Sequence, residues 1–432
     1  MVAVSIEGVV DTPEVRRRDW QIISLIGTVH ASSHFFQLVL PTLYLSLAQE
    51  YGYDFAQLGL LVSVFFLVSC LGQASSGFIV DRIGPAPVLH FGLAGFLVSA
   101  MLIAFSNGYI MLLLAAVIGG LGNSVFHPVD YSIINHRVSQ KRLGHAFSTH
   151  GFTGYLGWAL TPVFMAGLIE LYDWRVAAFG AGVLIAVMLF LAWLGRRLLA
   201  GHNDHFGLSD AQVAERRAAA AKPGADLSRQ SIGQTLMALL AQPALWGAFL
   251  FFLFTAGSLS AVQNYTIPML GDVYGIDKVL AGSTLSAYMI AAAVGMVAGG
   301  FLVGATPNTE RTVFASLLLA GLLLVVLTTG AMPPAVAMVL VALAGFCAGV
   351  SAPSRDMLIR RITPKGATGT VYGLVYSGMD VGSSLAPVAF GLMLDIGWRT
   401  APWYGAGISF VIGGILAVWV ARCAVRQAPR TA

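Results

Sequence analysis

The chain has 432 residues, of which 57% are hydrophobic and only 10% are charged. Soluble domains carry about 25% charged residues, so a water-soluble fold of this length is excluded. The formal net charge of +4 gives no indication of nucleic-acid binding, and we expect lipid to be the main solvent.

The chain begins with a polar segment, residues 1–19, that contains Arg16, Arg17 and Arg18. An apolar run follows from Trp20 to Leu47. This run is longer than the core of a signal peptide, so we expect it to be an uncleaved first membrane span.

Long apolar runs continue to the end of the chain. A helix needs about 20 residues to cross the roughly 30 Å hydrocarbon core of a bilayer. The runs of sufficient length are 20–47, 56–80, 86–106, 109–136, 143–170, 175–195, 243–270, 279–304, 312–330, 335–358, 367–394 and 401–422. They are too long and too uniformly apolar for barrel strands. The sequence therefore predicts an all-α integral membrane protein with twelve transmembrane helices.

The basic residues orient this protein in the membrane. With the N-terminus in the cytoplasm, all of the 24 lysine and arginine residues except Arg175, Lys278 and Arg399 fall on the cytoplasmic side. Cytoplasmic loops of membrane proteins carry such an excess of positive charge. We therefore expect both termini to be cytoplasmic, in a multi-pass protein of the bacterial inner (plasma) membrane.

The longest polar segment, residues 197–242, divides the spans into six and six. Within it, Ser209 and Gln212 have the spacing of a helix start before Val213–Ala221, although a solvated tether is the simpler interpretation. The predicted divisions are a cytoplasmic N-terminus (1–19), a first six-helix bundle (20–196), a linker (197–242), a second six-helix bundle (243–424) and a cytoplasmic tail (425–432).

The two halves of the chain repeat each other. The matched positions include Gly59–Gly282, Gly72–Gly295 and Gly77–Gly300 at an offset of 223, and Pro128–Pro353, Gly144–Gly369 and Pro162–Pro387 at an offset of 225. Six spans separate equivalent residues, so both copies enter the membrane in the same direction. We expect two parallel repeats related by an axis along the membrane normal, with a solute site between them.

The segment between spans two and three reads Gly77-Phe78-Ile79-Val80-Asp81-Arg82-Ile83-Gly84. In a chain of six plus six spans, it resembles the signature loop of the major facilitator superfamily. The resemblance implies that fold, and a conformational latch in which Asp81 docks on the start of span eleven, near Thr368–Thr370. The latch residues are Gly77, Asp81, Arg82 and Gly84. A solvated carboxylate is the alternative interpretation of Asp81.

Residues 30–165 carry a narrower resemblance. His34 and the segment Gly122-Asn123-Ser124-Val125-Phe126-His127-Pro128 look like the fosmidomycin-resistance branch of efflux proteins. That branch places an Asn-Asp pair three and four residues after the histidine, where this chain has Gln37 and Leu38. A proton-carrying aspartate is therefore missing at that place.

The resemblance to the superfamily also implies that spans one, four, seven and ten line the solute path. Spans one and four carry polar residues at i, i+4 and i+7, which places them on one helix face. The candidate residues of the substrate and proton pathway are His30, His34, Gln37, Asn123, His127, Asp130, Ser260, Asn264, Ser351, Arg355 and Asp380.

Each of these residues also has a structural interpretation. A charge at mid-membrane costs about 2.5–3.5 kcal/mol, whereas histidine can stay neutral and become charged in a wet cavity. A histidine bonded within helix packing is the alternative. Asp130 and Arg355 lie near the cytoplasmic ends of their spans, where snorkelling or a gate ion pair competes with substrate contact. Asp380, and His150 in span five, are equally suited to buried hydrogen bonds.

No cofactor or metal is predicted. The three cysteines lie in apolar runs without CxxC spacing, and the nine histidines lack metal-ligand spacing. No Walker motif is present, so energy has to come from ion gradients. An enzyme is not expected, because no catalytic constellation can be assigned. A sensor is not expected either, because the termini are short.

We therefore predict a secondary active transporter that works by alternating access. The first hypothesis is proton-coupled efflux of a small metabolite or drug, with anions among the candidates. The alternative is proton-coupled import of a small carboxylate or other metabolite. The predicted partners are the substrate, protons and the lipid bilayer, with the protein as a monomer.

Overall fold

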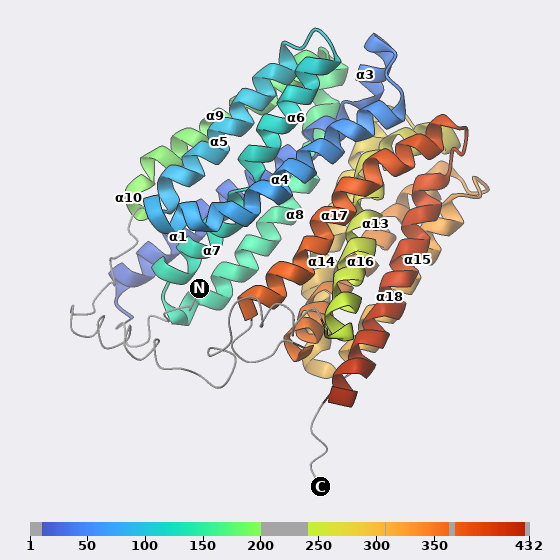
Figure 1. The fold of residues 1–432 in the computed structure, drawn as a ribbon. Helices are drawn as coiled ribbons and strands as arrows, with labels where there is room; N and C mark the ends of the chain where they lie inside the picture. The colour runs from blue at the N-terminus through green and yellow to red at the C-terminus, as the bar shows by residue number, and fades with distance from the viewer. Residues whose placement is uncertain (1–10, 200–240, 307, 363–367, 428–432) are drawn as a thin grey trace.

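The computed structural model describes residues 11–199, 241–306, 308–362 and 368–427, and these form helices joined by short connections (Figure 1). The helices of the first half are α1 (Pro13–Gln37), α2 (Val39–Thr42), α3 (Tyr44–Tyr51), α4 (Phe55–Ile83), α5 (Pro85–Ala104), α6 (Tyr109–Asn123), α7 (Phe126–Arg137), α8 (Gln140–Leu171), α9 (Trp174–Leu194) and α10 (Arg196–Leu199). Those of the second half are α13 (Pro243–Tyr274), α14 (Lys278–Ala305), α15 (Thr309–Leu327), α16 (Pro334–Ile362), α17 (Thr368–Asp395) and α18 (Ala401–Gln427).

The twelve-span prediction is confirmed in number and order. The first span consists of α1 to α3, the fourth of α6 and α7, and each other span of one long helix. Within the described residues, ten helical segments are long and apolar enough to cross a membrane. The first and eleventh spans are not among these ten segments. Both carry polar residues in mid-span, which lower their mean hydropathy: His34 in α1 and Asp380 in α17. The predicted helix at 213–221 lies outside the described residues.

The first and fourth spans are interrupted rather than continuous. Pro41 and Pro128 have no N–H group, so the carbonyls of Gln37 and Ser124, four residues earlier, lose their helical partner. The Ser124 carbonyl instead accepts a hydrogen bond from Ser76 Oγ of α4, at 3.2 Å. Both interruptions therefore lie at or next to candidate site residues.

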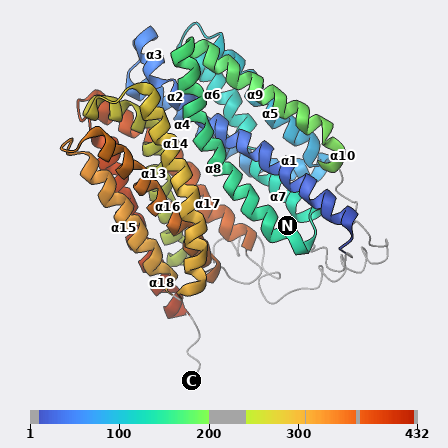
Figure 2. The same ribbon diagram turned by 180° about the vertical axis from the view of Figure 1, so that it is seen from behind.

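The helices form two bundles, α1–α10 and α13–α18, which stand side by side in Figures 1 and 2. α1 begins and α18 ends on the same face, which we call the termini face. In both views the bundles lie close together near the other face, which we call the opposite face, and diverge toward the termini face.

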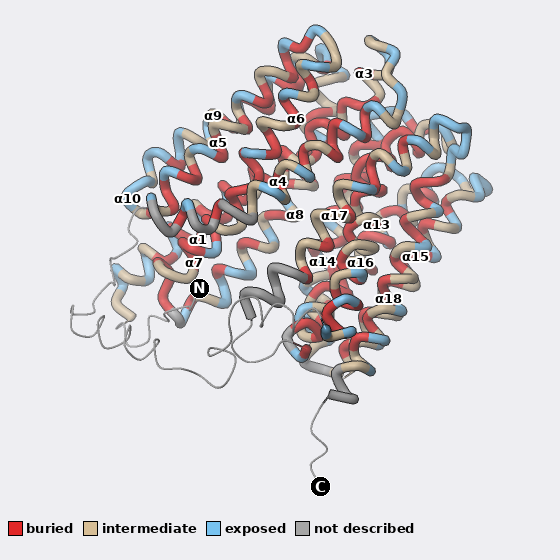
Figure 3. Tube along the Cα trace, in the orientation of Figure 1, coloured by how far each residue is buried: buried red, intermediate tan, exposed pale blue. Residues whose placement is uncertain are grey.

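The burial pattern is that of a membrane protein. Buried residues, red in Figure 3, run through the inside of each bundle, whereas large apolar side chains are exposed on the outside. Phe91 of α5, Phe190 of α9 and Phe301 of α14 are 57%, 56% and 78% exposed. Exposed apolar surface of this extent is typical of membrane contact. The protein is therefore a multi-pass membrane protein.

Equivalent residues of the repeat join the two bundles. A Cβ atom at Gly59 of α4 would collide with the carbonyl oxygen of Pro387 in α17. A Cβ atom at Gly282 of α14 would lie 3.2 Å from the carbonyl oxygen of Pro162 in α8. Each glycine thus faces the matching proline of the other bundle, as two parallel repeats require. We call these two contacts the opposite-face seal.

A carboxylate reinforces the seal beside Gly59. Asp395, the last residue of α17, accepts hydrogen bonds from the backbone N–H groups of Phe55 and Ala56, at 2.9 and 2.7 Å. Asp54 accepts a bond from the N–H of Gln57 at 2.7 Å. The Asp54 N–H in turn donates to Gln57 Oε1 at 3.1 Å, so all four free N–H groups at the start of α4 are satisfied, two of them by the other bundle.

Removal of this capping carboxylate, in an Asp395→Ala variant, is expected to weaken the seal by about 1 kcal/mol, the typical worth of a helix N-cap. The opposite face should then open about five times more often. Distances between spin labels at the exposed positions Leu171 and Ile396 report this opening. As control, Asp173→Ala removes a similar cap from α9, within one bundle. Equal changes in both variants would contradict the role of Asp395.

Ionic contacts fix the start of α1 to the start of α8. The Arg142 guanidinium donates to Asp19 at 2.8 Å and to Asp11 at 2.6 Å. Hydrogen bonds from Arg142 and Lys141 lower the pKa of the Asp11 carboxyl to about 2. Because this pKa is lowered by folding, the contribution of Asp11 is present above pH 4 and is lost only as the pH falls toward about 2.

The predicted latch lies partly outside the described residues. Gly84 has φ 84°, a left-handed conformation that supports the predicted tight turn between α4 and α5. The surroundings of Gly77, Asp81 and Arg82, and the first side chains of α17, lie outside the described part. The docking of Asp81 therefore stays a prediction.

Candidate functional site

A cavity of about 220 Å³ lies between the two bundles. Helices α1, α4, α6, α7 and α8 of the first bundle and α13 to α18 of the second contribute to its wall. Its polar residues are His34, Gln37, Ser69, Gln73, Asn123, His127, Tyr155, Trp158, Thr255, Gln263, Tyr288, Ser351, Arg355, Asp380 and Ser383. Apolar side chains complete the wall. Such a mixture is typical of small-molecule sites.

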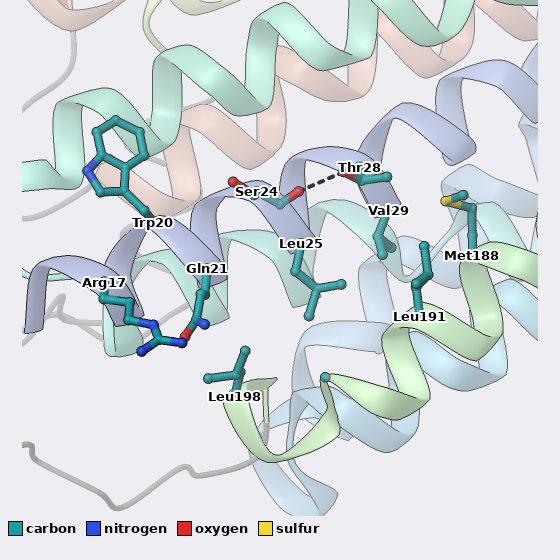
Figure 4. A pocket seen from close by; sticks show the side chains of 11 residues that line it. Arg17, Trp20, Gln21, Ser24, Leu25, Thr28, Val29, Met188, Leu191 and Leu198 are labelled. Atoms are coloured by element: carbon teal, nitrogen blue, oxygen red, sulfur yellow. Dashed lines mark hydrogen bonds between the residues drawn. The ribbon is translucent and has the colours of Figure 1, made fainter. Parts of the chain in front are cut away.

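A larger pocket, of about 670 Å³, is formed by α1, α9 and α10 (Figure 4). Its wall is mostly apolar, with Arg17 and Gln21 at one end, and Thr28 Oγ1 donates to the Ser24 carbonyl at 2.8 Å. All of its residues belong to the first bundle. The cavity between the bundles instead combines polar groups from both of them, so we take it as the candidate site.

Four histidines and one aspartate gather beside the cavity, and we call His30, His34, His127, His150 and Asp130 the histidine cluster. They come from α1, α7 and α8. The His30 and His150 rings stack with centroids 3.5 Å apart. The His30 ring centroid lies 4.5 Å from that of His34 and 5.5 Å from that of His127. Only His34 and His127 line the cavity, so the other members lie behind them.

Asp130 is the anchor of this cluster. Its side chain is fully buried, and its Oδ2 accepts hydrogen bonds from His30 Nδ1 at 2.9 Å and His150 Nε2 at 3.2 Å. Asp130 therefore does not snorkel in this conformation, and a gate ion pair stays a prediction. Arg355 pairs with its neighbour Asp356 at 2.9 Å. Span four thus places a carboxylate in the cluster, whereas span one has Gln37 and Leu38 after His34.

A chain of hydrogen bonds continues along the cavity wall. Trp158 Nε1 donates to Gln37 Oε1 at 2.9 Å, and Gln37 Nε2 donates to Asn123 Oδ1 at 3.1 Å. Asn123 Nδ2 in turn donates to Ser69 Oγ at 2.8 Å. The Trp158 ring also packs against His34, with centroids 4.2 Å apart. This chain fixes α1, α6, α8 and α4 around the cavity.

Several polar atoms of the cluster have no hydrogen-bond partner among the described residues. They are both ring nitrogens of His34, Nδ1 of His127 and Oδ1 of Asp130, all buried. An unsatisfied buried group costs about 1–3 kcal/mol, so each is a place where water, a proton or a ligand can bind. Gly154 makes room for the His34 ring, because a Cβ atom there would lie 3.0 Å from its Cε1.

The second bundle contributes different groups. Ser351, Arg355 and Asp380 line the cavity as expected of pathway residues. Ser260 and Asn264 are not part of its wall in this conformation, and their place in the pathway stays a prediction. Asn264 accepts a bond from the Tyr44 hydroxyl at 2.9 Å, which joins the two bundles, and donates to the Ser260 carbonyl of its own helix at 2.7 Å.

The two bundles carry opposite charges at equivalent positions. Asp130 and Arg355 are separated by 225 residues, the same offset that relates Pro128 to Pro353. All nine histidines precede residue 206, so the second bundle contains none. The repeat is therefore symmetric in its helices and asymmetric in its chemistry.

Several residues of the site were not among the candidates selected from the sequence. His150 was considered equally as a functional candidate and as a buried hydrogen-bonding group, and Trp158 was not considered. The pattern that could have selected His150 is its position four residues before Gly154, which puts both on the same face of α8. Nothing comparable marks Trp158, because its role depends on how α8 is rotated.

Two parallel six-helix bundles that share one polar cavity form an architecture typical of membrane transporters. The chain belongs to the Major Facilitator Superfamily, whose model matches residues 25–342 and 308–432. The resemblance found in the signature loop is thereby confirmed.

Individual relatives are more distant. The chain is 26% identical to the fosmidomycin resistance protein of Escherichia coli, over 72% of this chain and 75% of that protein. It is 26% identical to the membrane sensor protein UhpC of Salmonella typhimurium, over 87% and 84%. It is 22% identical to a probable L-galactonate transporter of Escherichia coli, over 81% and 78%.

Among solved structures, the chain is similar to a bacterial homolog of the human lysosomal transporter Spinster, in its inward-facing and unoccupied conformation. The TM-score is 0.69 at 15% sequence identity, over 94% of this chain and 96% of the other. This likeness establishes the fold.

Proposed function

We propose that the protein is a proton-coupled transporter of a small anion, and that the histidine cluster carries the proton. One observation carries this proposal. A fully buried carboxylate, Asp130, is bonded to two histidines directly behind the cavity-lining pair His34 and His127. Ionisable groups inside a membrane span are costly, and they typically mark an ion pathway.

The spacing of the cluster supports stepwise movement of a proton. A proton that enters from the cavity first meets His127 or His34, which have free ring nitrogens. The His34 and His127 ring centroids lie 4.5 and 5.5 Å from that of His30, and His30 is bonded to Asp130. A histidine can accept a proton at one ring nitrogen and release one from the other. The cluster thus places two steps between the cavity and the carboxylate, one from His34 or His127 to His30 and one from His30 to Asp130.

The opposite wall of the cavity supports binding of an anion. Arg355 lines the cavity from the second bundle, and its charge is only partly offset by the exposed side chain of Asp356. Arginine binds carboxylate and phosphate groups in a two-pronged geometry. A substrate anion at Arg355 and a proton on the histidine cluster would then occupy the same cavity from its two sides.

We propose export as the direction of transport. The support is the similarity to the fosmidomycin resistance protein. Import of a small carboxylate is the second candidate, supported by the similarity to a probable L-galactonate transporter and by Arg355. Reconstituted vesicles with an imposed pH gradient separate the two, because net movement against the proton flow indicates export and movement with it indicates import.

The remaining features follow from the sequence and stay proposals. The distribution of basic residues supports a cytoplasmic termini face in a bacterial plasma membrane. A conformation closed at the opposite face would then expose the cavity to the cytoplasm. We also propose a monomer without cofactor, with Asp81 as the latch that closes the termini face in the other state.

A ligand screen by thermal shift tests the site. Purified protein is tested with a panel of small carboxylates, phosphonates and drugs, and the expected result is stabilisation by one chemical class. The His34→Ala variant should lose that stabilisation, because the residue lines the cavity. His90→Ala, which removes a histidine of α5 outside the cavity, should retain it. Equal stabilisation of both variants would place the site elsewhere.

A further inference from the structure

Three histidines of the cluster have the arrangement of a metal site. His30, His127 and His150 each offer one ring nitrogen, and these three atoms lie within 4.8 Å of one another. They come from α1, α7 and α8, and they are 97 and 23 residues apart in the sequence. Their sequence spacing therefore gave no metal signal, since such signals depend on ligands that are close together along the chain.

The distances are close to those of a bound ion. Zinc–nitrogen bonds are about 2.0–2.1 Å, which places two nitrogens of a tetrahedral site about 3.3 Å apart. Because the three atoms lie within 4.8 Å of one another, they would have to approach by about 1.5 Å at most when an ion binds. All three side chains are largely buried, so few water molecules compete with an ion for their ring nitrogens.

The surroundings fit a cation. Asp130 accepts a hydrogen bond from one ring nitrogen of His30 and from one of His150. Carboxylates orient the histidine ligands of zinc in this way when the other ring nitrogen binds the metal. Its second oxygen, Oδ1, and both nitrogens of His34 have no partner among the described residues. These atoms offer a fourth ligand. His127 lines the cavity and gives an ion access.

We propose that His30, His127 and His150 bind one divalent transition-metal ion, with Asp130 supplying negative charge. Imidazole ligands favour Zn²⁺, Cu²⁺, Ni²⁺ and Co²⁺, whereas Mg²⁺ and Ca²⁺ need oxygen ligands. This site does not depend on the proposed transport function. If both hold, the metal and the proton compete for the same nitrogens, and a bound ion stops proton coupling.

The test is calorimetric titration of the purified full-length protein, without a polyhistidine tag, with Zn²⁺, Ni²⁺ or Mg²⁺. The expected result is one Zn²⁺ or Ni²⁺ ion per chain and no binding of Mg²⁺. The His150→Ala and His150→Gln variants should bind at least ten times more weakly. His90→Ala should bind as the unchanged protein does. Thermal unfolding without metal identifies which of the two His150 variants is folded.

X-ray absorption of the Zn²⁺ complex supplies a second readout. We expect imidazole scattering from three nitrogen ligands at about 2.0 Å. The proposal is overturned if no ion binds, if a folded His150 variant binds as tightly as the unchanged protein, or if fewer than two imidazoles surround the ion. Since neither measurement involves transport, failure of the proposed transport function would leave these results unaffected.

Discussion

Replacement of Asp130 by asparagine is expected to abolish proton-driven accumulation of the substrate while exchange of substrate across the membrane continues. Asparagine has the same shape and keeps one oxygen for His30 or His150, but it cannot take up a proton. One proton that moves down 100 mV provides about 2.3 kcal/mol, which supports a concentration ratio of nearly fifty at about 1.4 kcal/mol per decade. In the Asp130→Asn variant this ratio should fall to about one.

The measurement uses vesicles with reconstituted protein and the substrate class found in the ligand screen. Accumulation is followed under an imposed pH gradient, with a protonophore as the reference for zero coupling, and exchange is followed by counterflow. Asp173→Asn is the matched control, because it changes an aspartate that caps α9 and asparagine is an equally good cap. Full accumulation by Asp130→Asn would contradict the proton path, and so would a loss of counterflow in a folded variant.

The second large effect is expected at the opposite-face seal. In a Gly59→Leu variant, the new side chain would occupy the space of the Pro387 carbonyl, so the bundles could no longer close at that face. Overpacking of such a contact costs about 1–3 kcal/mol. The closed population and the transport rate should therefore fall about tenfold or more. Spin labels at Leu171 and Ile396 should shift to longer distances.

Gly167→Leu is the control for this experiment. Gly167 also lies in a long helix of the first bundle, but a Cβ atom there meets nothing within 4 Å. This variant should transport normally and keep the original label distances. The seal would be refuted as the closing contact if Gly59→Leu transported at the normal rate, or if both variants changed the label distances equally.

Most of the fold could be predicted from the sequence because each span is marked by its own apolar run. The repeat was also visible, since glycines and prolines recur at nearly constant offsets. The sequence did not show that the repeated glycines of one bundle contact the repeated prolines of the other. The contact between Gly59 and Pro387 depends on the tilt of α4 against α17, and no local pattern encodes that tilt.

The site residues could be predicted from the sequence only where their spacing along one helix places them on the same face. His30, His34 and Gln37 share a face of α1 by spacing alone, and the structure brings all three to the cluster or the cavity wall. In α13 the spacing alone does not decide which residue faces the cavity, because a shift of one residue turns a helix by about 100 degrees, and in this conformation Gln263 rather than Ser260 or Asn264 lines the wall.

The burial of Asp130 was missed for a related reason. Asp130 lies near the cytoplasmic end of span four, and this position suggested contact with water. The side chain is nevertheless fully buried, with His150 of α8 and His30 of α1 bonded to it. Cover of this kind comes from neighbouring helices, so the sequence of one span cannot reveal it. The long-range partners of a buried charge are therefore the least predictable part of the site.

The opposite charges at Asp130 and Arg355 have an evolutionary consequence. A dimer of two first halves would hold two sets of histidines and no arginine at this position, whereas a dimer of two second halves would hold no histidine at all. Neither ancestor-like assembly could bring acid and base together across one chamber. Because each half supplies only one of these two residues, both halves of the chain are needed to assemble the site.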